Sequence, residues 1–262
     1  MKLGFTEQQV ASWKDKSYYF KGTSNVAVVL VHGWTATPKQ IFPIAKAINE
    51  ERHTVSMPLL AGHGTKPEDL ESVVAEQWID DVRKAIEDVR NRAGVEKVLV
   101  GGVSMGGNLG MIVSLETKVD GIILIGTPVH LKNHVWVWIG SKIVPMFVKY
   151  GKKGYPKMVP NNELRKTTYQ YFPTINVRQC LKIIKKATYS LKKITAPILV
   201  LQTSSDSVVA KYSPWVIFNS VKSEIKKLQW IKSKNNNHVM NTTEVSDSIF
   251  VIKNFIEEIK KR

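Results

Sequence analysis

Residues 98–107 read Val-Leu-Val-Gly-Gly-Val-Ser-Met-Gly-Gly, so that an apolar stretch leads into a Gly-x-Ser-x-Gly pentapeptide centred on Ser104. The apolar run at 96–100 suits a buried parallel strand, and the residues after the pentapeptide have helical composition. Gly102 and Gly106 let the backbone turn tightly around the serine, because side chains there would collide with neighbouring backbone. The stretch therefore predicts a nucleophile elbow, in which a strand, a turn and a helix present the serine hydroxyl above a sheet edge.

Short apolar runs alternate with amphipathic segments along the rest of the chain. This alternation predicts an α/β fold with a mostly parallel central sheet and helices on both faces. About 70 residues separate two successive core strands, so we expect an α/β core at 1–127 and 190–262 and an inserted cap, or lid, at 128–189. The strands are predicted at 17–21, 26–31, 53–57, 121–126, 197–202 and 226–231, and the helices at 38–48, 72–92, 108–117, 176–189, 213–220 and 245–260.

The net charge of +16 is concentrated in the middle of the chain. We count 14 Lys or Arg residues between 127 and 195 against one acidic residue, Glu163. No zinc-finger spacing, RNP aromatic pattern or helix-turn-helix pattern accompanies this segment, so nucleic acid is not an expected partner. Two interpretations stay open: an ordinary solvated lysine-rich surface, and a surface that contacts anionic lipids.

The compartment and the cofactor content follow from a few absences in the sequence. Cys180 is the single cysteine, so an intramolecular disulfide cannot form. The first ten residues lack the apolar stretch of a signal peptide, and the longest apolar stretch, 135–148, is too short to span a bilayer. We therefore expect a cytoplasmic protein. The histidines show no metal-binding spacing such as His-Glu-x-x-His, and no metal or other cofactor is expected.

Ser104 needs a base, because a serine hydroxyl is a poor nucleophile at its own pKa and histidine can accept and return a proton near neutral pH. Where a serine sits on such an elbow, the acid and then the histidine follow it in the chain. Asp206 directly follows the strand predicted at 197–202, at the sheet edge that should carry the site. His238 is the one histidine beyond it. Ser104, Asp206 and His238 are therefore the candidate catalytic triad.

A second apolar strand ends in Val-His-Gly-Trp at residues 31–34, near the same sheet edge. Acyl transfer develops negative charge on the carbonyl oxygen, which preorganised N–H donors stabilise. An elbow supplies the N–H after the nucleophile and a second N–H from an early loop. The backbone N–H groups of Met105 and Trp34 are therefore the candidate oxyanion hole.

Taken together, these motifs resemble the α/β-hydrolase superfamily and, more closely, bacterial monoacylglycerol lipases and small carboxylesterases. The resemblance implies an α/β-hydrolase fold and a serine ester hydrolase whose cap covers an acyl pocket. His63 matches the family's loop histidine beside the site and is given no catalytic role. Two features depart from the family. Residues 32–36 read His-Gly-Trp-Thr-Ala where His-Gly-Phe-Thr-Gly is common, so Trp34 and Ala36 differ from the usual motif, and the cap is unusually rich in lysine. The stretches that carry the resemblance are 30–35, 59–70, 101–107, 205–209 and 237–239.

The expected activity is that of a serine carboxylic ester hydrolase, of carboxylesterase or monoacylglycerol lipase type, acting on a small-molecule acyl ester through an acyl-serine intermediate. A thioesterase, a peptidase, a carbon–carbon hydrolase or an acyltransferase could use the same triad, because a fold does not fix the reaction. A non-catalytic ligand-binding module is the rival from another class. In the insertion, lysines are expected to attract anionic lipid surfaces. The residues expected to bind the acyl chain are Trp136, Trp138, Met146 and Phe147.

Overall fold

The computed structural model describes residues 14–92, 94–153, 167–232, 238 and 242–262. Its central sheet has the strand order β1-β3-β2-β4-β5-β8-β9. The pairing of β1 with β3 is antiparallel and every other pairing in this sheet is parallel, which confirms the predicted α/β fold. The strands are β1 (Tyr18–Phe20), β2 (Val26–Val31), β3 (Thr54–Met57), β4 (Lys97–Val103), β5 (Gly121–Ile125), β8 (Ile198–Thr203) and β9 (Lys226–Ile231).

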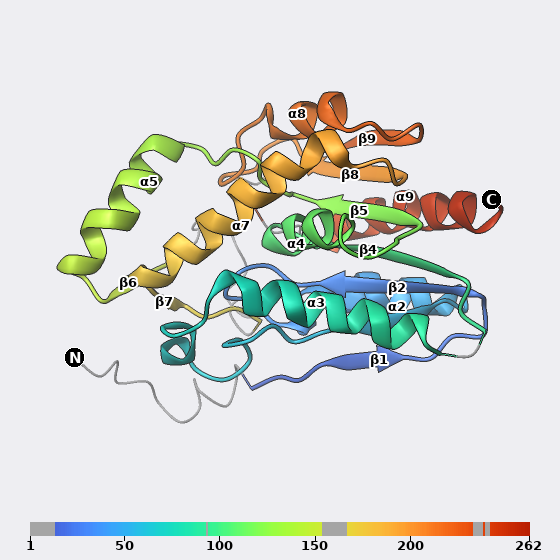
Figure 1. The fold of residues 1–262 in the computed structure, drawn as a ribbon, viewed down its shortest axis with the longest axis horizontal. Helices are drawn as coiled ribbons and strands as arrows, with labels where there is room; N and C mark the ends of the chain where they lie inside the picture. Colours follow the sequence, from blue (N-terminus) through green and yellow to red (C-terminus); the bar gives the residue numbers. More distant parts are fainter. Residues whose placement is uncertain (1–13, 93, 154–166, 233–237, 239–241) are drawn as a thin grey trace.

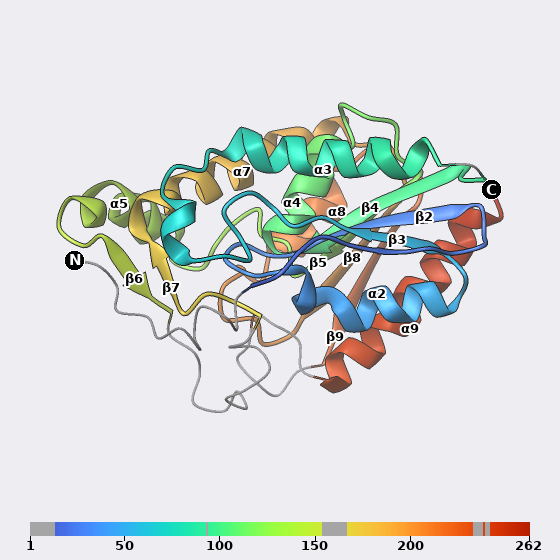
Figure 2. The same cartoon turned by 90° about the horizontal axis from the view of Figure 1, so that it is seen from below.

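Helices cover both faces of the sheet (Figures 1 and 2). One face carries α3 (Ala75–Arg90), α4 (Met105–Val113), α7 (Val177–Ser190) and α8 (Ser213–Ser220), whose apolar side chains share one core. The other face carries α2 (Phe42–Glu50) and α9 (Thr242–Lys260), which share a second core. Strand β2 lies between the two cores: all six of its residues are buried, and alternate residues point into opposite cores.

Four helices begin three or four residues away from the sequence prediction: α2 at 42, α3 at 75, α4 at 105 and α9 at 242, against 38, 72, 108 and 245. Helix α4 begins at Met105, directly after Ser104, rather than at 108. Its three glycines lower the intrinsic helix propensity, but all nine residues of the helix are buried, so packing outweighs propensity. The helix predicted from residue 38 opens as a 3-10 turn, Pro38–Ile41, before α2 begins.

The predicted cap, residues 128–189, lies between β5 and β8 in the chain. It contains α5 (His134–Ile143), a 3-10 turn at Val144–Met146, a hairpin of β6 (Tyr150–Lys152) with β7 (Tyr171–Pro173), and α7. The sequence predicts no strand between 128 and 189; residues 150–152 and 171–173 instead form short strands, and 154–166 lie outside the described residues. Three-residue strands carry too little periodicity to be recognised. The limits 128–189 for the cap stay a prediction.

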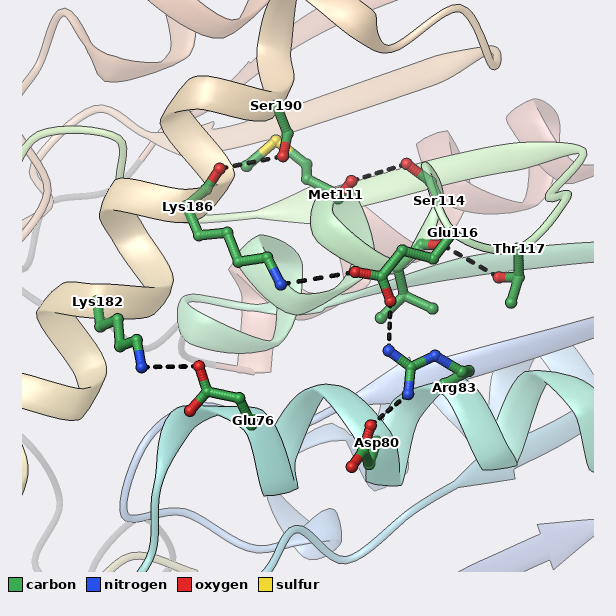
Figure 3. A network of polar contacts seen from close by, with 11 residues as sticks. Glu76, Asp80, Arg83, Met111, Ser114, Glu116, Thr117, Lys182, Lys186 and Ser190 are labelled. Carbon is green, nitrogen blue, oxygen red and sulfur yellow. Dashed lines mark hydrogen bonds and ion pairs between the residues drawn. The ribbon is translucent and has the colours of Figure 1, made fainter.

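Ion pairs join α7, the last helix within the predicted cap limits, to its neighbours on the same face of the sheet (Figure 3). Lys182 lies 2.7 Å from Glu76 on α3, and Lys186 lies 3.5 Å from Glu116. Glu116 also forms an ion pair with Arg83 on α3. Exposed pairs of this kind contribute about 0–1 kcal/mol each, so apolar packing of α7 on α4 supplies most of the attachment. Within the described ranges, no helix combines the length and the apolar character that crossing a bilayer requires.

Candidate active site

Ser104 occupies the turn between β4 and α4 with φ 54° and ψ −118°. A non-glycine residue in this conformation stores about 1–3 kcal/mol of strain, which the surrounding structure must hold. The Ser104 N–H donates to the Ile125 carbonyl at 2.8 Å. A Cβ on Gly102 or Gly106 would lie only 2.1 or 2.2 Å from the Val31 carbonyl oxygen, so both positions require glycine. The geometry is that of the predicted nucleophile elbow.

Asp206 and His238 lie against each other near the carboxyl ends of β8 and β9. The His238 Nδ1 atom is 3.0 Å from Asp206 Oδ2 and 3.2 Å from Oδ1. Three further donors hold the buried carboxylate: the N–H groups of Val208 and Val209 reach Oδ1 at 2.7 and 2.9 Å, and Gln202 Nε2 reaches Oδ2 at 2.9 Å. The carboxylate is therefore fixed in orientation and presents an acceptor to the imidazole.

The ionisation of Asp206 follows from its contacts. Burial alone would raise the pKa of Asp206, but the adjacent His238 and the hydrogen bonds from His238, Val209 and Val208 outweigh it and lower the pKa below its ordinary value. An ionised Asp206 accepts the Nδ1 proton, which leaves Nε2 of the neutral imidazole as an acceptor. Nε2 is buried and finds no hydrogen-bond partner within the described part of the chain. The imidazole therefore has one nitrogen available for a proton.

The loop at 33–36 lies beside Ser104, because a Cβ on Gly33 would be 3.6 Å from the Ser104 Cβ. The Trp34 N–H makes no hydrogen bond to any described residue, and neither does the N–H of Met105 at the start of α4. The other three N–H groups of the loop each donate a hydrogen bond. Gly33 donates to Gln40 Oε1 at 2.9 Å, Thr35 to His63 Nε2 at 2.9 Å, and Ala36 to the Gly33 carbonyl at 3.1 Å. The two predicted oxyanion donors are thus the ones left available.

Two buried histidines support this loop, and the sequence did not reveal their part. His32 donates from Nδ1 to the Gly33 carbonyl at 2.9 Å and accepts the Leu60 N–H at 3.2 Å. His63 lies against the Ala61 carbonyl through Nδ1 at 3.0 Å while its Nε2 accepts from Thr35. Burial lowers the pKa of His32 to about 4 and that of His63 well below its ordinary value, so both rings are neutral. They act as neutral supports of the loop.

The Trp34 side chain joins the loop to the cap. Its Nε1 donates to Asn176 Oδ1 at 2.9 Å, and its ring centroid lies 5.0 Å from that of Phe172 on β7. Asn176 is buried and donates in turn to the Leu70 carbonyl at 2.7 Å. The residue that departs from the common Phe therefore adds an N–H group that reaches the cap.

The four residues expected to bind the acyl chain share an exposed part of the cap. Their exposed fractions are 74% for Trp136, 54% for Trp138, 74% for Met146 and 80% for Phe147. Trp138 also lines a cavity of about 750 Å³ between α5 and α7. Their part in binding an acyl chain stays a prediction, and each of these side chains is more than half exposed.

The sequence is similar to those of known proteins. Residues 22–235 match the family Hydrolase_4, described as Serine aminopeptidase, S33. The chain is similar to the thermostable monoacylglycerol lipase of Bacillus sp. (strain H-257), 26% identical over 222 residues that cover 84% of this chain and 86% of that protein. It is also similar to the carboxylesterase of Bacillus subtilis (strain 168), 24% identical over 245 residues that cover 93% of this chain and 97% of that protein.

Solved structures agree on the fold. A structure from the study of the metagenome-derived lipolytic enzymes LipS and LipT has a TM-score of 0.81 at 24% identity, covering 94% of this chain and 98% of its own. A soluble variant of monoglyceride lipase from Saccharomyces cerevisiae has a TM-score of 0.76 at 14% identity, with coverage of 93% and 90%. The family match spans well over half of the sequence. The chain therefore belongs to the Hydrolase_4 family of α/β-hydrolases, related to bacterial monoacylglycerol lipases and carboxylesterases, and is a hydrolase of the lipase and esterase group.

Proposed function

We propose that the protein hydrolyses carboxylic esters of small or medium acyl chains, monoacylglycerols among them, through an acyl-Ser104 intermediate. The observation that carries the proposal is the pairing of His238 with Asp206, which leaves a buried Nε2 acceptor with no partner among the described residues. In this mechanism Nε2 takes the hydroxyl proton as Ser104 attacks the ester carbonyl. Asp206 keeps the imidazole in the required tautomer and stabilises the imidazolium that forms.

The remaining steps use the two free backbone donors. The N–H groups of Trp34 and Met105 stabilise the negative oxygen of each tetrahedral intermediate. Collapse of the first intermediate expels the alcohol, which receives its proton from His238 and leaves the acyl group on Ser104. A water molecule, deprotonated by His238, then releases the carboxylic acid and regenerates the enzyme.

The charge of the cap favours a neutral ester over a peptide with a free amino terminus. An aminopeptidase substrate carries a cationic ammonium group, so a site that binds it needs carboxylate side chains nearby. Residues 127–195 contain 14 basic residues and the single acid Glu163, so the local field repels such a substrate. Two similar proteins support ester chemistry, because one is named a monoacylglycerol lipase and the other a carboxylesterase.

We further propose that residues 128–189 act as a cap that meets anionic lipid surfaces. Trp136 and Phe147 are largely exposed, and aromatic side chains of this kind insert at membrane interfaces. The lysines are not all equally free: Lys149 lies 3.2 Å from Glu71, and burial lowers the pKa of Lys153 to about 8. Lys152 is exposed, and its ammonium lies 5.9 Å from the Tyr171 ring centroid.

The test is a substrate comparison on the purified protein and its Ser104→Ala variant. It uses p-nitrophenyl esters of increasing chain length, glycerol monoesters, an acyl thioester and an aminoacyl p-nitroanilide. The proposal expects turnover of the esters that the variant lacks, and none of the anilide. Turnover of the thioester alone would make the protein a thioesterase, and turnover of the anilide alone a peptidase; either result would overturn the proposal.

A further inference from the structure

A cavity of about 750 Å³ lies between α5, α7 and the loop that follows β5. Figure 1 shows the two helices, with α5 at the left of the molecule. The walls of the cavity are largely apolar and include Leu131, Trp138, Leu181, Ile184 and Tyr189. Among the described residues that line it, none belongs to the candidate triad or to the loop at 33–36, and Trp138 is one of the four residues expected to bind the acyl chain. The volume of the cavity falls in the range of about 300–1,000 Å³ that is typical of small-molecule sites.

Cations border this cavity, and the described residues of its lining include no Asp or Glu. Two of the four cations are already engaged. Lys182 pairs with Glu76 at 2.7 Å, as Figure 3 shows, and Arg178 donates to the carbonyls of Ser141 and Lys142 at 2.8 and 3.0 Å. The other two, Lys142 and Lys185, have no carboxylate partner in the described part of the chain. These two ammonium groups are available to a ligand.

Both free lysines lie over aromatic walls of the cavity. The Lys142 ammonium is 3.6 Å from the centroid of the Trp138 ring, and the Lys185 ammonium is 5.8 Å from that of Tyr189. The two residues stand on different helices, α5 and α7, on either side of the space. A cation over an aromatic face is held against apolar surface while it keeps its charge. The cavity therefore combines an apolar interior with positive charge at its edge.

We propose that the cavity between α5 and α7 binds a single-chain anionic amphiphile, whose alkyl chain lies along the apolar walls and whose head group is held by Lys142 and Lys185. Carboxylate and phosphate head groups share the required charge, and both form charge-assisted hydrogen bonds with lysine. Binding does not depend on ester hydrolysis. A neutral alcohol of equal chain length gains the burial of its chain alone, at about a fourfold increase in affinity per methylene group.

Isothermal titration calorimetry with decanoate, decyl phosphate and decanol, each below its aggregation concentration, tests this assignment. The double variant Lys142→Gln/Lys185→Gln removes the charge from exposed side chains and should fold normally, which thermal unfolding checks. Lys192→Gln/Lys193→Gln is the matched control, because these lysines are exposed and are not among the described residues lining the cavity. A third sample carries a decyl phosphonyl group on Ser104, which fills any acyl pocket at the proposed nucleophile.

The proposal expects one anion per chain, bound at least about tenfold more tightly than decanol, on both the untreated and the phosphonylated protein. The Lys142/Lys185 variant should lose about tenfold in affinity for the anions with decanol unchanged, and the control variant should match the wild type. Tighter binding of decanoate indicates a fatty acid ligand, and tighter binding of decyl phosphate a lipid head group; both support the site. Equal affinity for decanol, insensitivity to the Lys142/Lys185 change, or loss of binding on phosphonylation would overturn it. If Ser104 does not react, the proposed hydrolase mechanism fails, and the untreated protein still tests the cavity.

Discussion

The indole N–H of Trp34 donates a 2.9 Å hydrogen bond to Oδ1 of Asn176, joining the loop beside Ser104 to the segment that opens the cap helix α7. Asn176 is buried, and its amide group also donates to the carbonyls of Leu70 and Val73 at 2.7 and 3.2 Å. One side chain thus connects three segments that are far apart in the sequence. This contact ties the loop at 33–36 to the segment that precedes α7.

Replacing Trp34 by Phe should destabilise the fold more than it impairs catalysis. The change keeps the backbone N–H and an aromatic ring, but it leaves the buried Asn176 Oδ1 without its donor, which costs about 1–3 kcal/mol. We expect a loss of that size in the free energy of unfolding in urea, with kcat/KM reduced less than tenfold. Trp215→Phe on the exposed surface of α8 is the control. Unchanged stability would show that the Trp34–Asn176 contact has no role.

Replacing Asp206 by Asn should abolish most of the activity and leave the fold intact. The carboxamide oxygen of the variant can still accept from Val208 and Val209, whereas the imidazolium loses its countercharge and His238 loses its fixed tautomer. We expect kcat to fall by on the order of 10⁴, with KM little changed. Asp88→Asn, at an exposed position on α3, is the control. Turnover near the wild-type rate would remove Asp206 from the proposed triad.

The buried neutral histidines should make the fold sensitive to mild acid. Burial lowers the pKa of His32 to about 4, so between pH 6.5 and 4 the unfolded chain binds a proton that the folded chain does not. The stabilisation is fully present above pH 6.5 and is lost as the pH falls. His32 should contribute about 1.4 kcal/mol to the loss between pH 7.5 and 5.5, and His63, whose pKa is also lowered, should add to it.

Urea unfolding at pH 7.5, 6.5 and 5.5 measures this dependence on the wild type and on His32→Gln. The variant should be less stable at pH 7.5 but should lose about 1.4 kcal/mol less over the same interval, because glutamine does not titrate. Identical slopes for the two proteins would show that His32 is not held neutral in the folded chain.

Exposed aromatic groups and lysines on the cap should bind the protein to anionic vesicles. Trp136→Ser/Phe147→Ser should weaken binding to phosphatidylglycerol vesicles by at least about tenfold, since both side chains are exposed and available to the interface. Lys149→Gln/Lys152→Gln should weaken it at low salt only, at roughly 1 kcal/mol per charge. Lys157, of the same basic segment, lies outside the described residues.

Sedimentation with anionic and with neutral vesicles, at low and high salt, measures both effects. Hydrolysis of a short soluble ester should be unchanged in the Lys149/Lys152 variant, and Lys192→Gln/Lys193→Gln is the control for loss of charge alone. Equal sedimentation with both vesicle types, insensitive to salt and to the substitutions, would leave the cap lysines as an ordinary solvated surface.

Local sequence signals were sufficient for the elbow and for the order of the candidate site. Gly102 and Gly106 mark a turn that no other residues fit. Strand β2 is apolar throughout, and β8 is apolar over residues 198–201, because both faces of these strands are buried. The contact between Asp206 and His238 could be anticipated because both follow strands that end at one edge of a parallel sheet.

Other features depend on contacts between distant segments and leave no local pattern. The sequence around His32 and His63 does not reveal that their ring centroids lie 4.9 Å apart, or that both rings support the loop beside Ser104. The β6–β7 hairpin pairs three residues with three others about twenty positions away, which no periodicity signals. The exposure of Trp136 and Phe147 was equally hidden, because a run of apolar residues does not indicate which side of a cap it occupies.

Mass spectrometry after reaction with a fluorophosphonate tests the central claim, that Ser104 is the nucleophile, most directly. We predict one phosphonyl group per chain, located by peptide analysis on Ser104, with loss of ester turnover in proportion to labelling. His238→Ala should label far more slowly, and Ser104→Ala should neither label nor hydrolyse esters. Labelling at another residue, or ester turnover by Ser104→Ala near the wild-type rate, would contradict the assignment of Ser104 as the nucleophile.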